Sequence, residues 1–245
     1  MNGNRSFLST LVLLILLNAG LPPAEAVRLK YDFQVGATYR IEVKTSIVTD
    51  FKVFGKTKST SIEDRKNFSA TVLMLNNNLW VIDIGDENTR CRRFIKPDGT
   101  IVKSISDQRS EIPFFISLPK DEFLPGQTYT LSRMLPWGEE QIPATWLVKW
   151  DDSQHAKTAS GSNKIIPLKY NGNVVFPPEK SKIRSLEISG MLLFDATSGL
   201  PASGTWTTEY KLKIDRKEMA IVRPLYSYRE VRRVSFRVFS EDLKK

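Results

Sequence analysis

The sequence predicts an all-β fold in which one antiparallel sheet curls into a half-barrel. Long stretches alternate apolar and polar residues with the two-residue period of a strand. Residues typical of tight turns separate these stretches, and the pattern of an amphipathic helix is missing. The chain has 245 residues, of which 41% are hydrophobic, so it is long enough to bury a sizeable core.

Three stretches carry the clearest strand pattern. From Tyr39 to Val53, apolar residues and threonines occupy the odd positions, and they alternate with Arg40, Glu42, Lys44, Ser46, Asp50 and Lys52 at even positions. The same alternation returns at residues 206–214 and 233–238. Ordinary strands have about 5–6 residues. The first stretch is much longer, either as one strand or as two strands joined by a bulge, and this length predicts a large, curled sheet.

Turn residues join the shorter strands. Asn76, Asn77 and Asn78 separate residues 68–75 from 79–84, and asparagine tolerates the left-handed backbone of a tight hairpin. Residues 97–99 join 90–96 to 100–106 in the same way, and residues 196–199 follow a strand at 186–194. Residues 107–125 contain three prolines and predict an irregular crossing.

A weak internal repeat suggests two related halves. Phe33, Gly36 and Tyr39 have the same spacing as Phe123, Gly126 and Tyr129, and Gly99 has a looser counterpart in Gly199. We therefore expect a first β half at residues 27–120 and a second at residues 121–245, forming one compact unit. The alternative is that unrelated β segments use the same turn before a strand.

The first 26 residues have the features of a secretory signal peptide. A polar start with Arg5 precedes an apolar run at residues 7–17, and Ala24-Glu25-Ala26 is typical of a cleavage site. The apolar run is shorter than the roughly 20 residues that a membrane-spanning helix needs. We expect cleavage near Ala26, export to the periplasm or the medium, and no transmembrane span in the mature chain. The single cysteine, Cys91, excludes an intramolecular disulfide.

The turn-and-strand motifs resemble an uncharacterised family of exported bacterial β-rich proteins. The resemblance lies in residues 29–39, in Leu124-Pro125-Gly126-Gln127-Thr128-Tyr129, and in Phe194-Asp195 with Gly199. The long strands after these turns are also similar, at the level of fold, to the half-barrels of periplasmic lipoprotein carriers and lipid-transport proteins. Neither resemblance implies a catalytic residue or a cofactor.

No pattern in the sequence predicts catalysis, a cofactor or a metal site. The single histidine, His155, lies in a polar stretch, and one histidine with one cysteine cannot form the usual zinc sites. Cys91 is expected to be an unreactive strand residue. The acidic residues lack calcium-loop spacing at either of their two clusters, 83–87 and 151–152. A hydrolase that uses two carboxylates stays open, because its acids can come from anywhere in the chain.

Two groups of residues are candidate binding residues. The first is aromatic, and it would line an apolar pocket or else belong to the core: Trp146, Trp150, Trp206 and Tyr210. The second is a basic stripe on the last strand, which would contact an anionic lipid or polymer or else be solvated: Arg229, Arg233 and Arg237. The chain carries a net charge of +9, and no nucleic-acid motif accompanies it.

These observations leave three functions open. The first is a non-catalytic envelope protein that binds an apolar or lipid-like ligand. The second is an interaction or structural scaffold of the cell envelope, with a strand edge or the basic stripe as contact surface. The third is a carboxylate-dependent hydrolase. The expected partners are a lipid or another envelope protein, without nucleic acid, and the sequence does not determine the oligomeric state.

Overall fold

A computed structural model describes residues 26–53, 56–106, 117–137, 140–151, 164–174, 176, 182–214 and 226–241. The predicted signal peptide up to residue 25 and His155 lie outside these residues. The strands are β1 (Thr38–Val53), β2 (Lys56–Asn76), β3 (Leu79–Gly85), β4 (Arg90–Ile95), β5 (Ile101–Ser106), β6 (Thr128–Trp137), β7 (Glu140–Trp150), β8 (Ile165–Val174), β9 (Lys182–Asp195), β10 (Leu200–Ile214) and β11 (Ser227–Glu241). Among the described residues, no helix is long and apolar enough to cross a membrane.

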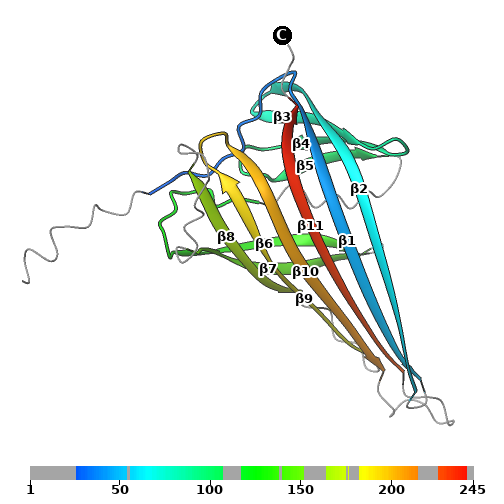
Figure 1. The fold of residues 1–245 in the computed structure, drawn as a ribbon. Helices are drawn as coiled ribbons and strands as arrows, with labels where there is room; N and C mark the ends of the chain where they lie inside the picture. Colours follow the sequence, from blue (N-terminus) through cyan, green and yellow to red (C-terminus); the bar gives the residue numbers. More distant parts are fainter. Residues whose placement is uncertain are drawn as a thin grey trace, which may run out of the picture.

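All eleven strands form one antiparallel sheet, in the order β5-β4-β3-β2-β1-β11-β10-β9-β8-β7-β6. The sheet is open, with β5 at one edge and β6 at the other, and it curls strongly (Figure 1). Strands β1 to β5 pair consecutively, and so do strands β6 to β10. Strand β11 joins the two sets by pairing with β1 and β10. The predicted all-β, curled antiparallel sheet is confirmed.

Five long strands, β9, β10, β11, β1 and β2, form a tapering ribbon that we call the ribbon (Figure 1). Strands β3, β4 and β5 lie at its wide end, and its narrow end is where β1 ends and β2 begins. Paired residues share a face, so the register defines an inner face with Tyr39, Ile41 and Val43 and an outer face with Arg40 and Lys44. The predicted alternation of residues 39–53 is therefore the two-faced pattern of β1.

Residues 27–37 cross the inner face at the wide end, and we call them the strap. Val27 forms an isolated bridge with Phe123. The Tyr31 N–H donates to the Pro97 carbonyl at 2.7 Å, and the Asp32 N–H donates to the Gly199 carbonyl at 3.0 Å. Because these partners belong to both halves of the chain, the strap ties the two halves together.

The main core lies between the strap and the inner face. Tyr31 stacks on Phe33 with ring centroids 5.6 Å apart and meets Phe194 edge-on at 5.7 Å. Phe33 in turn contacts Trp80 of β3 at 5.7 Å. Strand residues from both halves complete this cluster, including Ile41, Ile82, Val148, Leu168, Leu192 and Phe236. The wide end of the inner face is thus filled by the chain's own side chains.

A second, smaller core holds β7 against the ribbon. Ile142 and Ala144 of β7 pack with Val174, Phe176 and Leu186, and Trp146, Ile188 and Tyr210 lie at its border. Figure 1 shows β6 and β7 crossing the direction of the ribbon strands. The curl of the sheet therefore brings β7 over the inner faces of β9 and β10.

The two sequences with the Phe-x-x-Gly-x-x-Tyr spacing form turns of the same geometry. Gly36 and Gly126 both have positive φ, at 84° and 77°. The Gly36 N–H donates to the Val72 carbonyl on β2, and the Gly126 N–H donates to the Trp150 carbonyl on β7. Strands β1–β5 and β6–β10 follow these turns in the same order. This correspondence agrees with two related halves, and a common ancestry of the halves stays a prediction.

The predicted hairpin turns also form. Asn77 and Asn78 have φ angles of 47° and 59°, the left-handed values that asparagine tolerates. They connect β2 to β3. Gly99 and Gly199, at φ 80° and 67°, follow β4 and β9 in the two halves. The local turn chemistry of the sequence therefore sets where these hairpins reverse.

Candidate binding surface

An aromatic row crosses the inner face toward the narrow end of the ribbon. Phe51 of β1 meets Tyr228 of β11 with ring centroids 5.1 Å apart, and Tyr228 lies 5.9 Å from Tyr210 of β10. Tyr210 contacts Phe176 at 6.0 Å, and the guanidinium of Arg184 on β9 covers the Phe176 ring at 4.9 Å. The row joins four strands and the segment after β8, so it exists only in the folded sheet.

The register explains why these rings meet. Phe51 and Tyr228 are direct cross-strand partners on one face, and Tyr228 faces Leu212 on its other side. Tyr210 lies two residues before Leu212 and is therefore a diagonal neighbour of Tyr228. Aromatic rings at such positions contact each other across strands. Phe176 is buried, whereas the other three rings stay half-buried.

A polar cluster lies beside the row on β11. The Tyr228 hydroxyl donates to Glu230 Oε2 at 2.5 Å, and Arg232 Nη2 donates to Glu230 Oε1 at 3.3 Å. Burial and the neighbouring Glu230 carboxylate raise the pKa of Tyr228 to about 12. Tyr228 therefore stays protonated at neutral pH and donates to Glu230, whose charge Arg232 balances.

Apolar side chains continue from the row onto the uncovered part of the inner face. Ile47 of β1 faces Ile62 of β2, and Ile62 is 61% exposed. Val53, at the end of β1, is also exposed. We call this surface the inner strip, and its members are Ile47, Phe51, Val53, Ile62, Tyr210 and Tyr228. The exposed members of the strip offer apolar contact area that no described residue covers.

All four predicted aromatic residues lie on the inner face, but in two different places. Trp150 belongs to the main core, and its ring centroid lies 6.2 Å from that of Phe123. Trp206 packs against the same core and contacts Phe236 at 5.4 Å. Trp146 and Tyr210 border the second core. The four residues thus share a face without forming one cluster, and only Tyr210 reaches the inner strip.

The three predicted basic residues share the outer face of β11 but differ in their charge partners. Arg229 Nε donates to Glu209 Oε1 at 2.6 Å, and its Nη1 lies 3.4 Å from Asp50 Oδ2. The hydrogen bond from Arg229 lowers the pKa of Glu209. Arg233 and Arg237 are exposed and have no ion pair with any other described residue. Arg229 is therefore neutralised, and the stripe is reduced to two arginines.

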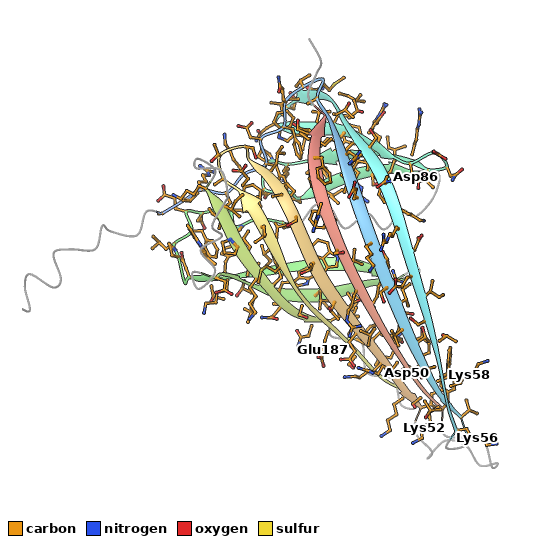
Figure 2. The ribbon with its side chains drawn as sticks, viewed as in Figure 1. Asp50, Lys52, Lys56, Lys58, Asp86 and Glu187 are labelled. Atoms are coloured by element: carbon orange, nitrogen blue, oxygen red, sulfur yellow. The ribbon has the colours of Figure 1, made fainter. Side chains whose placement is uncertain are left out.

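Figure 2 locates Asp50 at the narrow end of the ribbon, together with Lys52, Lys56 and Lys58. Asp50 also accepts a hydrogen bond from the Ser59 hydroxyl at 2.6 Å. Asp50 and Glu209 are the two carboxylates that Arg229 brings together, and they lie on the outer face. Among the described residues, no group of three or more histidine, cysteine, aspartate or glutamate side chains is arranged to hold a metal ion.

Cys91 is buried on β4, with its Sγ 3.1 Å from the Ser104 hydroxyl of β5. The face that it shares with Arg93 is the buried face of the strand, as the alternation of residues 90–93 predicts. A buried thiol that shares a hydrogen bond with a hydroxyl is a packing residue of the β4–β5 hairpin.

No family model matches the chain, and no curated protein matches it. Among solved structures, the chain is similar to an outer membrane channel from Pseudomonas putida F1. The sequences are 10% identical, the match covers 89% of this chain and 100% of the channel, and the TM-score is 0.24. A TM-score this low does not establish a shared fold.

Proposed function

We propose that the chain is an exported, non-catalytic binding protein of the cell envelope that holds an apolar or lipid-like ligand on the inner strip. The signal-like start of the sequence supports export. The observation that carries the proposal is the inner strip itself, in which the half-buried rings of Phe51, Tyr210 and Tyr228 are continued by the exposed side chains of Val53 and Ile62. Ligand sites in proteins combine apolar side chains with a few polar groups. On this face the apolar members of the strip have charged cross-strand neighbours, among them Lys58 opposite Phe51 and Arg232 opposite Ile47.

The position of the strap limits where such a ligand binds. The wide end of the inner face is occupied by Tyr31, Phe33 and their core partners, so the strip toward the narrow end is the part of this face with exposed apolar side chains. Toward the narrow end, the inner positions of β2 are exposed and those of β1 are half-buried. An acyl chain laid along β1 would cover Ile47 and Phe51, and each buried methylene contributes about 0.8 kcal/mol.

The polar cluster supports an amphipathic ligand. The Glu230 carboxylate balances the charge of Arg232 and accepts a hydrogen bond from the Tyr228 hydroxyl. The cluster can therefore border an apolar ligand without leaving a buried charge unpaired. The Thr45 and Thr49 positions on β1 alternate with the apolar ones on the same face. A ligand with a long apolar part and a small polar end fits this surface better than a compact polar metabolite does.

The proposal is tested by two matched substitutions on β2. Ile62→Glu places a carboxylate on the inner strip, and Ser61→Glu places the same charge on the opposite face of the same exposed strand. We expect Ile62→Glu to weaken the binding of an environment-sensitive fluorescent fatty acid at least about fivefold, because the carboxylate must be desolvated by the ligand. Ser61→Glu leaves the affinity unchanged. Equal effects of the two changes, or no saturable binding, would contradict the proposal.

A scaffold role is the second candidate, because β2 has a long open edge. Residues 56–68 of β2 pair with β1, and no other described strand pairs with them. An open edge can add a strand from a partner protein. Lys58, Asp64 and Lys66 point to the inner face beside this edge, and such inward charges oppose uncontrolled edge pairing. If the chain does not bind the fluorescent fatty acid, this open edge of β2 becomes the leading candidate for the surface that contacts a partner protein.

A further inference from the structure

The outer face of the ribbon carries a cluster of basic residues centred on Ser235. Lys44 of β1 lies directly opposite Ser235 of β11 and, on its other side, opposite Arg65 of β2. Arg233 and Arg237 precede and follow Ser235 by two residues and therefore point to the same face. Arg40 of β1 extends the cluster. We call these five residues the cationic patch: Arg40, Lys44, Arg65, Arg233 and Arg237.

The cationic patch is only partly neutralised. Two carboxylates lie on the same outer face as the patch. Glu42 is the cross-strand partner of Arg237, and Glu63 is the cross-strand partner of Ser46. Glu42 accepts from Arg40 at 2.9 Å, and Glu63 lies 3.9 Å from the Lys44 ammonium. Five positive and two negative charges leave a surplus of three. Arg229, farther along β11, differs because Glu209 and Asp50 hold it, so this surplus is a local property of the patch.

Hydroxyl groups lie between the basic side chains. Ser46 is opposite Arg233, Thr205 is opposite Ser235, and Thr207 is the other cross-strand neighbour of Arg233. Neighbouring strands are about 4.8 Å apart, and residues i and i+2 are separated by roughly 6.6 Å. Arginine, lysine and hydroxyl donors at these spacings can share the oxygens of one phosphate group.

An exposed aromatic side chain borders the patch. Phe239 is opposite Arg40 and two residues beyond Arg237, and it is 39% exposed. The Arg40 guanidinium lies 5.1 Å from its ring centroid. A soluble polyanion gains little from an apolar ring, whereas basic residues beside phenylalanine are the composition of surfaces that enter the headgroup region of a bilayer. Phe239 therefore favours a membrane as the partner.

We infer that the cationic patch and Phe239 form a docking surface for a bilayer that contains anionic phospholipid. The arginines and Lys44 contact lipid phosphates, and Phe239 inserts at the level of the headgroups. This inference goes beyond ligand binding on the inner strip, because the two surfaces are opposite faces of β1 and β11. One face would hold a lipid-like molecule while the other keeps the chain at the membrane from which such a molecule comes.

The test is co-sedimentation of the mature chain with vesicles of phosphatidylcholine alone or mixed with phosphatidylglycerol. We expect binding to the mixed vesicles, loss of that binding at high salt, and weak binding to phosphatidylcholine alone. The double variant R233Q/R237Q should lower the partition coefficient by about tenfold or more. The control K96Q/K120Q removes the same charge from exposed positions at the wide end and should leave the partition coefficient nearly unchanged.

A second variant separates a bilayer from a soluble polyanion. Phe239→Ser keeps every charge, and we expect it to weaken vesicle binding while the retention on immobilised heparin stays the same. Vesicle binding that is insensitive to Phe239→Ser, or that falls equally in K96Q/K120Q, would overturn the inference, as would the absence of binding to the mixed vesicles. The fatty-acid titration measures binding to the inner strip, whereas the vesicle assay measures binding to the cationic patch. A negative vesicle result is therefore distinguishable from a negative result for the proposed ligand site.

Discussion

Replacing Tyr31 by alanine is expected to lower the free energy of unfolding by about 3–5 kcal/mol. The Tyr31 side chain is 1% exposed and contacts both Phe33 and Phe194, so its removal leaves a cavity between the strap and the sheet. Such a loss is a large share of the 5–15 kcal/mol that stabilises a typical domain. Chemical denaturation followed by tryptophan fluorescence measures it.

The strap supplies its own control. Val35 is an apolar residue of the same segment but is 53% exposed, so Val35→Ala should change the free energy of unfolding by no more than about 0.5 kcal/mol. Similar losses in the two variants would mean that the strap is not a part of the core. A large loss in Tyr31→Ala alone supports a strap that closes the wide end of the inner face.

The second large effect is expected at the turn between β9 and β10. Gly199 has φ 67°, and a Cβ added there would lie 2.6 Å from the Asp32 Cβ and 2.9 Å from the Asp32 N. Gly199→Ala therefore combines a left-handed backbone penalty with a clash against the strap, and it should cost about 2–5 kcal/mol. The clash also displaces the hydrogen bond from the Asp32 N–H to the Gly199 carbonyl.

Gly126 provides the comparison without a clash. Its φ is 77°, but a Cβ added there meets nothing within 4 Å. Gly126→Ala should therefore cost only the backbone penalty of about 1–2 kcal/mol. Urea denaturation of the two variants under the same conditions gives the difference. Equal losses would show that the strap does not press on the turn at Gly199.

Much of the fold follows from local chemistry that is visible in the sequence. Residues 39–53 alternate because one face of β1 is packed and the other is solvated, and the asparagines at 77 and 78 take the left-handed backbone that their hairpin requires. The sequence does not indicate the first half of β2. Its residues 56–67 are exposed on both faces, so no alternation marks them, and their pairing with β1 supports the strand.

The candidate surface could be predicted only in part. The sequence assigns Tyr210 either to an apolar pocket or to the core. It does not indicate the neighbours Phe51 and Tyr228, which are distant from Tyr210 in sequence and meet it only through the register of β1, β11 and β10. Arg229 likewise looks like a free cation in the sequence. Its acidic partners come from β1 and β10, and a sequence pattern does not reveal such pairing across strands.

The most direct test of a lipid-like ligand on the inner strip is native mass spectrometry of the chain purified from the envelope fraction of the cells that produce it. We expect a population that carries one apolar molecule, released by organic extraction, and we expect that population to be depleted in Ile62→Glu and retained in Ser61→Glu. A mass that corresponds to the bare chain in all three proteins would contradict a lipid-like ligand on the inner strip.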